Sequence, residues 1–449
     1  MAATARAFKV AFKCTGCGRC CTGKGGVAYV NSSEVAAMAE HLALPKATFA
    51  KTYLRSVNGA TALRQTDDDS QCIFLDGKRC SVYPARPTQC RTYPFWPQQL
   101  ISKYDWTLAA NECEGILLDA PSPETITPDA HILKEVVIHE VHRSGENLTY
   151  DDIDELVSEL EPEMLDAFQE EVDAKYQRTI LHEDDEILVM DSFLDGLPPT
   201  RSLHFVDRLE LVQSEILLNE DGSINDAALA LDVHKGLCVG LALLPTERLH
   251  NLRIGLLGAG AGVLPTFLQR HLRGEVLMDA VDPSRAMLSA GQRFFHLIPS
   301  DRLSLHEAMG EAYVARQPDA SLDWLVLDVE DGNAAPTELR APPASFLTPA
   351  FMADASRVLT GDGSLAINVI FPKASGDADA SLEMLRVLLS PHFASIYVLA
   401  LPKNAVVFAA KRERTEAPTA LVNDGSIGRP LAATIREQLA ASTLRRLGE

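Results

Sequence analysis

From about residue 200 to 412 the chain alternates between two patterns of hydrophobic and polar positions. Short apolar runs rich in Val, Ile and Leu are followed by longer segments whose apolar residues recur every three or four positions. The first pattern predicts buried strands, the second predicts amphipathic helices, and their alternation predicts a parallel sheet joined by crossover helices. The expected strands are 253–258, 275–282, 303–308, 322–329 and 364–371, and the expected helices are 263–272, 284–295, 349–359 and 380–393.

The last two strands of this region fix the type of sheet. The apolar runs 394–401 and 405–411 are separated only by Pro402, Lys403 and Asn404. A parallel crossover needs about a dozen residues or more, so these two strands must be antiparallel. The sequence therefore predicts an α/β fold of the class I, Rossmann-like methyltransferase type, in which a parallel sheet ends in an antiparallel hairpin.

The segments before this sheet have other patterns. Residues 203–224 predict a β-hairpin with its turn at 219–222, followed by an apolar helix that Asp232 caps and Pro245 ends. From about 128 to 182 the pattern is helical, and the many acidic residues there predict a solvated face.

Cysteines are distributed unevenly, which divides the chain further. Eight of the nine lie before residue 114, and only Cys238 stands apart. The sequence therefore predicts four parts: a Cys-rich metal-binding domain at 1–120, an acidic helical connector at 121–199, the methyltransferase-like domain at 200–412, and a tail with one helix at 413–449.

Composition and charge narrow the classes of function. A chain of 449 residues with 46% hydrophobic and 23% charged residues is expected to be globular. It has no apolar run near the ~18 residues that span a bilayer, and we expect a cytoplasmic protein without a membrane partner. A net charge of −21 argues against nucleic acid, whose binding requires surplus Lys and Arg, and favours a basic protein as partner.

A glycine-rich turn in the predicted sheet is a candidate cofactor site. The segment "LLGAGAGVLP" places Gly258, Ala259, Gly260 and Gly262 between a strand and a helix, where glycine allows a tight turn and close approach of a ligand. Asp282 follows at the end of the next strand, where a carboxylate can accept both hydroxyls of a ribose. S-adenosylmethionine (SAM) and NAD both carry that ribose, and the predicted terminal hairpin favours SAM.

Residues 200–412 resemble the spermidine-synthase-like methyltransferases, and most of all the family that modifies elongation factor 1-alpha. The resemblance rests on "LVQSE", "GLALL", "GLLGAGAGVLPTFL", "AVDPSRAML", "LVLDVED" and "APPASFLTPAFM". It implies that Gly258, Gly260 and Asp282 bind SAM, and that Asp328 faces the methyl group or the incoming amine. Where that family has an acid that contacts the adenine amine, this sequence has Met309.

The motifs around the fourth strand bear on the methylated group. Asp328, Glu330 and Asp331 cluster where an amine would arrive, and Asp328 is the candidate catalytic residue that orients the amine or accepts its proton. No Asn-Pro-Pro-Tyr follows this strand and no Pro-Cys pair occurs, so the usual sequence motifs of nucleobase methyltransferases are missing. We therefore expect an amine on a protein as the substrate.

The N-terminal cysteines are candidate metal ligands. In a reducing compartment clustered cysteines more often hold metal than form disulfides. Four thiols per tetrahedral ion is a common structural set, so eight thiols could fill two sites. The adjacent Cys20 and Cys21 suggest either that there are two sites or that one of these two cysteines is a ligand and the other binds no metal. Iron–sulfur ligation is the alternative. The candidate ligands are Cys14, Cys17, Cys20, Cys21, Cys72, Cys80, Cys90 and Cys113.

The pattern CxxCxxCC followed by "CIFLDGKRCSVYPARPTQCRTYPF" and "CEG" is similar to the YkgJ-type family, described as zinc- or iron-chelating. All eight cysteines of that pattern are present, which implies bound zinc or iron. By contrast, His139 and His142 in "HEVH" lack the four-residue spacing of a zinc-protease motif, and we interpret them as structural.

Together these features predict a SAM-dependent methyltransferase that acts on a protein amine, a lysine or an N-terminus, with a zinc- or iron-chelating N-terminal domain. The alternative is a metal or redox module whose methyltransferase-like half is an inactive scaffold. The oligomeric state does not follow from the sequence.

Overall fold

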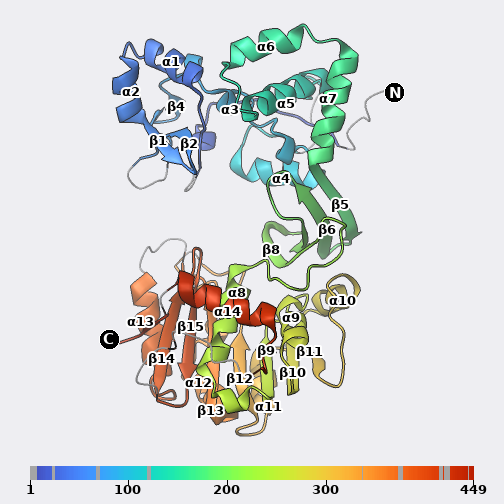
Figure 1. Cartoon of the computed structure of the whole chain (residues 1–449), viewed down its shortest axis with the longest axis vertical. Helices are drawn as coiled ribbons and strands as arrows, with labels where there is room; N and C mark the ends of the chain where they lie inside the picture. The colour runs from blue at the N-terminus through green and yellow to red at the C-terminus, as the bar shows by residue number, and fades with distance from the viewer. Residues whose placement is uncertain are drawn as a thin grey trace. The chain divides into compact units, whose positions relative to one another are not determined.

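The computed structural model describes residues 8–22, 26–66, 71–118, 123–335, 337–372, 378–413, 418, 425–442 and 444–448. The chain divides into two compact units. Unit 1 contains residues 1–179 and 192–197, and unit 2 contains residues 180–191 and 198–449. Figure 1 labels the helices and strands of both units.

Unit 2 is built on an eight-stranded sheet with the order β11-β10-β9-β12-β13-β15-β14-β16 among the described residues. The strands from β11 to β13 are parallel, whereas β15 is antiparallel to both β13 and β14. The expected parallel sheet with an antiparallel terminal hairpin is therefore confirmed, and with it the class I methyltransferase type of fold. The strands are β9 (Asn251–Leu257), β10 (Glu275–Asp282), β11 (Leu303–Glu307), β12 (Leu322–Leu327), β13 (Leu359–Val369), β14 (Ser395–Ala400), β15 (Ala405–Ala410) and β16 (Leu444–Arg446).

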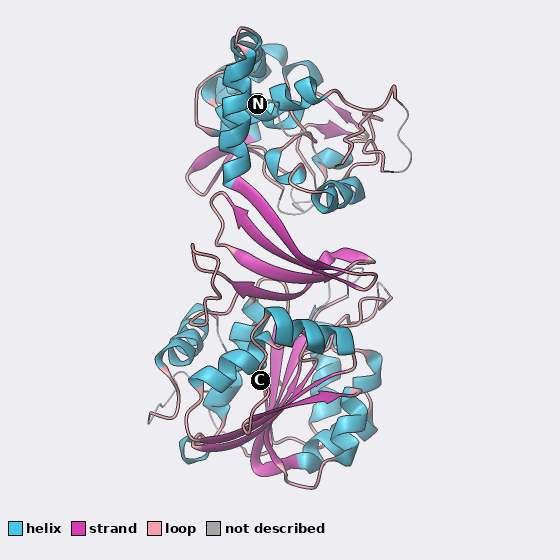
Figure 2. Cartoon of the chain, turned by 90° about the vertical axis from the view of Figure 1, so that its right-hand side faces the viewer, coloured by secondary structure: helices cyan, strands magenta, loops and turns pink. Residues whose placement is uncertain are grey.

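Helices cover both faces of this sheet (Figure 2). Alternate residues of β12 enter two different apolar clusters, Trp324 and Val326 on one face and Leu325 and Leu327 on the other. Such a strand is buried on both sides, which explains its nearly continuous apolar sequence. The helices of unit 2 are α8 (Asp232–Cys238), α9 (Val263–His271), α10 (Arg285–Phe294), α11 (Gly310–Arg316), α12 (Pro349–Val358), α13 (Ala378–Leu389) and α14 (Arg429–Ala441).

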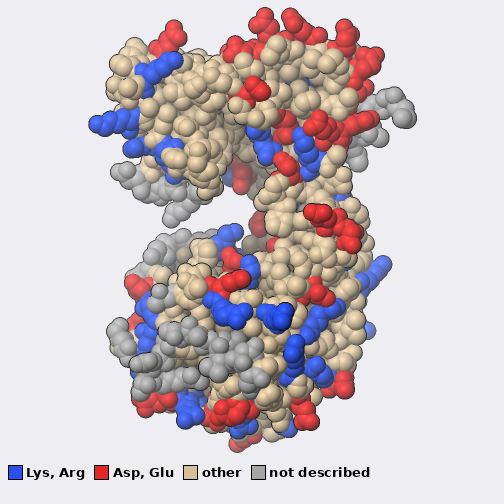
Figure 3. All heavy atoms as spheres, in the orientation of Figure 1, with Lys and Arg blue, Asp and Glu red and all other residues tan. Residues whose placement is uncertain are grey.

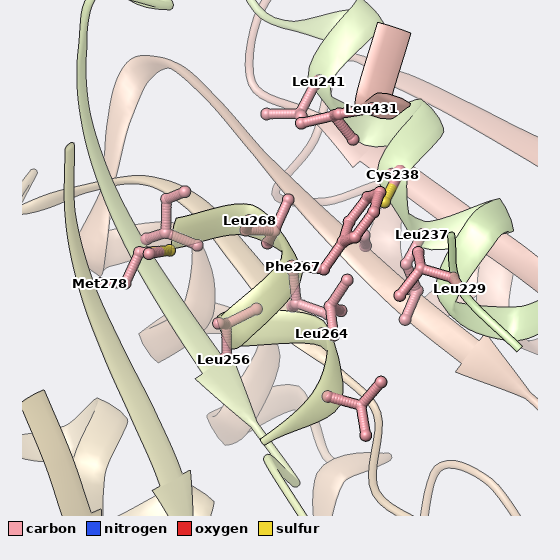
Figure 4. Packing of buried hydrophobic residues seen from close by; sticks show 14 of the residues in the cluster. Leu229, Leu237, Cys238, Leu241, Leu256, Leu264, Phe267, Leu268, Met278 and Leu431 are labelled. Carbon is pink, nitrogen blue, oxygen red and sulfur yellow. The ribbon is translucent and has the colours of Figure 1, made fainter. Parts of the chain in front are cut away.

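One of these clusters joins α8, α9 and the C-terminal helix α14 (Figure 4). Leu237 of α8, Phe267 of α9 and Leu431 of α14 belong to the same buried set. The C-terminal segment also supplies β16, which pairs antiparallel with β14. The described part of the predicted tail 413–449 is thus packed into unit 2.

A four-stranded sheet with the order β5-β6-β7-β8 precedes the large sheet, and the chain passes from one unit to the other within β5, within β6 and again between β6 and β7. The helical pattern that we expected as far as 182 ends at Lys175, because the following residues form β5. The hairpin expected over 203–224 with its turn at 219–222 was predicted wrongly, because β7 and β8 pair across a turn at Val206 and Asp207. The turn at 219–222 instead brings Ile224 back against Leu218. The strands are β5 (Tyr176–Glu183), β6 (Ile187–Leu194), β7 (Thr200–Phe205) and β8 (Arg208–Leu217).

Unit 1 combines short helices and two small hairpins around separate apolar clusters. The largest fully buried side chains include Trp106, Phe49 and Ile153, one from each cluster. The elements are α1 (Ser32–His41), α2 (Lys46–Tyr53), α3 (Thr88–Arg91), α4 (Lys103–Glu112), α5 (Asp129–Arg143), α6 (Tyr150–Ser158), α7 (Pro162–Lys175), β1 (Leu54–Val57), β2 (Ala60–Leu63), β3 (Leu75–Asp76) and β4 (Arg79–Cys80).

Acidic side chains gather on the surface of α6 and α7 (Figure 3). Asp151, Glu155 and Glu163 are exposed there, as the sequence pattern predicts for a solvated face. Among the described residues, no helix combines the length and the apolar character that crossing a membrane requires.

Candidate cofactor site and cysteine clusters

The glycine-rich turn connects β9 to α9 at the carboxyl edge of the parallel strands. Gly258 has φ 79°, and a Cβ there would lie 2.1 Å from the backbone oxygen of Asp328. Gly262 has φ 77° at the N-terminus of α9, where a Cβ would meet the side chain of Leu297 at 2.4 Å. Both positions therefore require glycine, and the turn stays close to the end of β12.

Asp282 lies at the end of β10 and is only 8% exposed. Its Oδ2 accepts a hydrogen bond from the backbone N–H of Gly260 at 2.8 Å, and its Oδ1 accepts one from the N–H of Ser284 at 2.9 Å. Burial raises the pKa of this carboxyl, and the two backbone bonds oppose that rise. A carboxylate has about four acceptor sites, so Asp282 keeps capacity for the two hydroxyls of a ribose.

Asp328 follows β12 directly and is held by two side chains from other elements. Its Oδ1 accepts a hydrogen bond from Nδ2 of Asn368 on β13 at 2.9 Å, and its Oδ2 lies 3.3 Å from Nε2 of His234 on α8. Nδ2 of Asn404 donates to Oδ1 of Asn368 at 2.8 Å. These contacts form a polar network that fixes the position of the carboxylate.

A pocket of about 220 Å³ adjoins this network. Its polar lining comes from His234, Asp328 and the backbone of the glycine turn, and the remaining lining is apolar. The residues that line it are His234, Leu256, Leu257, Gly258, Ala259, Leu264, Pro265, Val326 and Asp328.

The structure thus brings the turn, Asp282 and Asp328 to one edge of the sheet. Sequence reasoning missed His234, Asn368 and Asn404, because residues from α8, β13 and the β14–β15 link meet only in the folded chain. The one available signal was the position of Asn368 near the end of a predicted strand of a parallel sheet, where functional groups collect.

The other acids after β12 have partners outside the network. Glu330 forms an ion pair with Arg340, and Oδ1 of Asp331 accepts a hydrogen bond from the backbone N–H of Asn333 at 2.9 Å. Met309 stands at the N-terminal cap of α11, where its side chain is 57% exposed.

In unit 1, the first cysteines lie beside the last one. The backbone N–H of Lys13 donates to the carbonyl of Gly115 at 2.8 Å, and Oγ1 of Thr15 donates to the carboxylate of Glu114 at 2.7 Å. These bonds hold the segment of Cys14 and Cys17 against the segment of Cys113. Burial raises the pKa of Cys113, and the nearby Cys17 and Cys20 raise it further.

The remaining cysteines form a second group. The backbone N–H of Cys72 donates to the carbonyl of Cys21 at 2.7 Å. Burial raises the pKa of Cys90, and the charges of Cys72, Cys20 and Cys80 add to that rise. The thiol of Cys21 hydrogen-bonds to Cys20 and lowers the pKa of Cys20 to about 6.

All nine cysteines are free thiols. As they stand, the described residues contain no group of three or more His, Cys, Asp or Glu side chains arranged to hold a metal ion. The donor set itself, eight thiols in segments that backbone hydrogen bonds bring together, is the chemistry that zinc and iron–sulfur clusters use.

The two histidines of "HEVH" have structural partners. Nε2 of His142 lies 3.0 Å from Oε2 of the buried Glu34 on α1. Nδ1 of His139 lies 3.1 Å from Oγ1 of Thr92, and its ring stacks on Trp96. The interpretation of both as structural agrees with these contacts.

Comparison with known proteins gives a family match for the N-terminal part of the chain. Residues 13–114 match the model of a family described as "CxxCxxCC: Putative zinc- or iron-chelating domain". An uncharacterized protein of Methanocaldococcus jannaschii is 33% identical over 116 residues, which are 24% of this chain and 60% of that protein.

Two curated relatives are eEF1A lysine and N-terminal methyltransferases. The one from Homo sapiens is 30% identical over 156 residues and the one from Bos taurus is 28% identical over 155 residues. Each match covers 33% of this chain and 22% of the relative, so the chain spans less than a quarter of the length of these enzymes.

Solved structures give similar results. Human methyltransferase-like protein 13 in complex with SAH is 24% identical, with coverage of 47% of this chain and 93% of that one and a TM-score of 0.36. A probable spermidine synthase from Corynebacterium glutamicum is 15% identical, with coverage of 60% and 96% and a TM-score of 0.43. Both TM-scores are low, and the fold assignment rests on the strand order of unit 2.

The two resemblances identified from the sequence are thus confirmed. The N-terminal part of the chain matches the CxxCxxCC family, and the chain is similar to methyltransferases that modify eEF1A.

Proposed function

We propose that unit 2 is a SAM-dependent methyltransferase that acts on an amine of a protein. The observation that supports it most directly is the buried Asp282, whose carboxylate holds Gly260 of the turn and keeps acceptor sites for a ribose. The similarity to enzymes named for methylating eEF1A lysine and N-terminus favours a protein amine, of a translation factor among other candidates. The charge of −21 suits a basic substrate.

Residues of three elements would hold the cofactor and its reaction partner. Gly258, Ala259, Gly260, Gly262 and Asp282 would bind SAM, with Asp328 at the reacting end. When bound, SAM supplies an electrophilic methyl group on a sulfonium, which transfers in line to a lone pair. Before the transfer the chain has to position the amine and remove its proton, a role that we assign to the polar network at Asp328.

Unit 1 would hold zinc or iron through its eight cysteines, as a structural centre or as a means to dock the substrate. Thiolates bind these metals, and both thiol groups lie in segments that backbone hydrogen bonds hold together. Elemental analysis and an ultraviolet-visible spectrum of anaerobically purified protein would identify the metal and distinguish zinc from an iron–sulfur cluster. We propose a cytoplasmic location, where such thiols stay reduced.

Titration with S-adenosylhomocysteine (SAH) in a calorimeter tests the enzymatic half. We expect saturable binding and a rise in melting temperature. Incubation of a cell lysate with the protein and tritiated SAM should then label a discrete protein band. No heat and no thermal shift would support the alternative, a metal or redox module on an inactive methyltransferase-like scaffold, for which Met309 is the best argument.

A further inference from the structure

The side chain of His234, which lines the pocket beside the glycine turn, has one buried polar atom without a partner among the described residues. His234 is the third residue of α8, and its side chain is 12% exposed. It lines the 220 Å³ pocket together with Gly258, Ala259 and Asp328. Its Nε2 faces Asp328, whereas its Nδ1 is buried and has no hydrogen-bond partner in the structure.

Both oxygens of Asp328 already contact protein groups, so an incoming amine would meet this carboxylate together with its partners. Nδ2 of Asn368 donates to Oδ1 at 2.9 Å, and Nε2 of His234 lies 3.3 Å from Oδ2. The amide of Asn368 cannot be turned around, since its Oδ1 accepts from Nδ2 of Asn404 at 2.8 Å. The network therefore holds the carboxylate in one orientation toward the imidazole.

This arrangement determines the tautomer of the imidazole. An ionised carboxylate carries only lone pairs, so a ring nitrogen that faces it at 3.3 Å is favoured in its protonated form, and for His234 that nitrogen is Nε2. A neutral imidazole then has its lone pair on Nδ1. An acceptor left buried without a partner destabilises the free protein, and a ligand with an N–H donor would relieve that cost.

We infer that His234, oriented by Asp328, accepts the proton of the substrate amine in the proposed methyl transfer. An N–H bond of the alkylammonium breaks, its electron pair stays on nitrogen, and the proton forms a new bond to Nδ1. The neutral amine now has the lone pair that methyl transfer requires. Asp328 faces the resulting imidazolium and offsets its positive charge, and the proton leaves to water when the product departs. Asp328 is thus a positioning residue, and this inference rests on the proposed function.

The tautomer is measurable without any substrate. In the full-length protein labelled with ¹⁵N-histidine, the signal of His234 is the one that disappears in His234→Gln (H234Q). At pH 8 we expect an unprotonated Nδ1 and a protonated Nε2 in the wild type. Asp328→Asn should change this signal, because an amide can also donate. A protonated Nδ1 in the wild type would overturn the inference.

Activity provides the second measurement. Gln can keep a donor toward Asp328 but has no basic nitrogen. The Kd of H234Q for SAH should therefore stay within threefold of the wild-type value. Its rate of labelling lysate proteins from tritiated SAM should be about a hundredfold lower. The matched control is H392Q, a histidine on a loop of unit 2 away from the pocket, which should behave as the wild type does.

The outcomes separate the two proposals. If H234Q binds SAH and labels as fast as the wild type, His234 does not take the proton and only this inference fails. If the wild type neither binds SAH nor labels any protein, the proposed function fails, and the tautomer of His234 still decides whether Nδ1 is the basic atom of the pocket.

Discussion

At the scale of single residues, Asp282 is the most direct test of the cofactor site. Asp282→Asn removes the charge that would accept the ribose hydroxyls but keeps the size of the side chain. Hydrogen bonds to charged groups contribute about 1.5–3 kcal/mol each, so we expect the Kd for SAH to rise about tenfold to a hundredfold. Calorimetry at pH 8 measures this change. Asp301→Asn, at an exposed turn of unit 2, is the control and should leave the Kd unchanged.

The same residue predicts how binding depends on pH. Because burial raises the pKa of Asp282, the free protein takes up a proton on this carboxyl above the usual range for aspartate. Ribose hydroxyls bind the ionised form better, so the affinity for SAH should fall as the pH is lowered into that range. In D282N this dependence should be absent. A wild-type affinity that stays constant from pH 8 to pH 4 would place the ribose elsewhere.

Met309 allows the opposite kind of test, a gain of affinity. An aspartate at this exposed cap of α11 would provide the acid that the methyltransferase resemblance places beside the adenine amine, so Met309→Asp should tighten SAH binding about three- to tenfold. Asp is also a good helix cap, which alone adds about 1 kcal/mol of stability. Met309→Ser separates the effects, because it caps the helix without the charge. Equal affinities of the Asp and Ser variants would show that the adenine lies away from position 309.

Residue by residue, the sequence predicted the groups that a linear motif carries and missed those that only the fold assembles. Asp282 and Asp328 follow predicted strands of one parallel sheet, so their common edge is predictable. His234 comes from a helix about 90 residues before Asp328 in the sequence. The distance between the two side chains depends on how α8 packs on β13 and β15. No spacing in the sequence encodes that packing.

At the scale of secondary structure elements, the contact between α3 and α5 makes unit 1 sensitive to acid. Burial lowers the pKa of His139 to about 3, and the positive charges of Arg143 and His142 contribute to this shift. Between the unfolded value near 6.5 and about 3, the unfolded chain binds a proton that the folded chain does not. Stability therefore falls as the pH falls through this window, by up to about 1.4 kcal/mol per pH unit.

His139→Gln tests this contribution. Other buried groups act in the opposite direction, since burial raises the pKa of Asp105, Glu135 and Glu140. The measured quantity is therefore the difference in unfolding free energy between wild type and variant, from urea titrations at pH 7, 6 and 5. We expect this difference to shrink as the pH falls, because the wild type loses the contribution that the variant lacks. A difference that is independent of pH would contradict the assignment to His139.

The C-terminal helix α14 provides a second test at this scale. Ile435 is fully buried in the cluster that contains α8 and α9 residues, so Ile435→Ala should reduce the unfolding free energy of unit 2 by about 2–5 kcal/mol. Arg436→Ala changes the exposed face of the same helix and should cost less than about 0.5 kcal/mol. If both variants were as stable as the wild type, α14 would not be part of this core in solution.

Elements with a strong period were predicted well, whereas their ends were not. The strands and helices of the large sheet lie where the apolar pattern places them, because burial on both faces leaves a nearly continuous apolar run. The end of α7 at Lys175 differs from the expectation, since Tyr176 leaves the helix to join β5 while its ring stays in the apolar cluster of unit 1. The turn of the β7–β8 hairpin likewise depends on pairing with a partner strand, which local residue preferences do not encode.

At the scale of the whole molecule, the uneven distribution of cysteines predicted that two parts of the chain are stabilised differently. Unit 2 has two large apolar clusters, one on each face of its sheet. Unit 1 has several small ones and, in addition, eight thiols in two groups. The sequence identified those thiols through the CxxCxxCC spacing, but which of their segments lie side by side follows from backbone hydrogen bonds between distant parts of the chain.

This difference predicts that metal removal affects the two units unequally. A metal that binds only the folded state at a thousandfold excess over its Kd adds about 4 kcal/mol, or roughly 10 °C in melting temperature for a domain of this size. Scanning calorimetry of the full chain should show two transitions, of which SAH raises only that of unit 2. Metal removal by chelation should lower the other transition by about 10 °C and change the Kd for SAH less than twofold.

Replacement of Cys17 and Cys72 by Ala should reproduce this loss, whereas Cys238→Ala, a buried thiol of unit 2, should lower only the transition that SAH raises. If the loaded and metal-free proteins melted alike, metal bound to the thiols would not stabilise unit 1, which would fold on its apolar clusters alone.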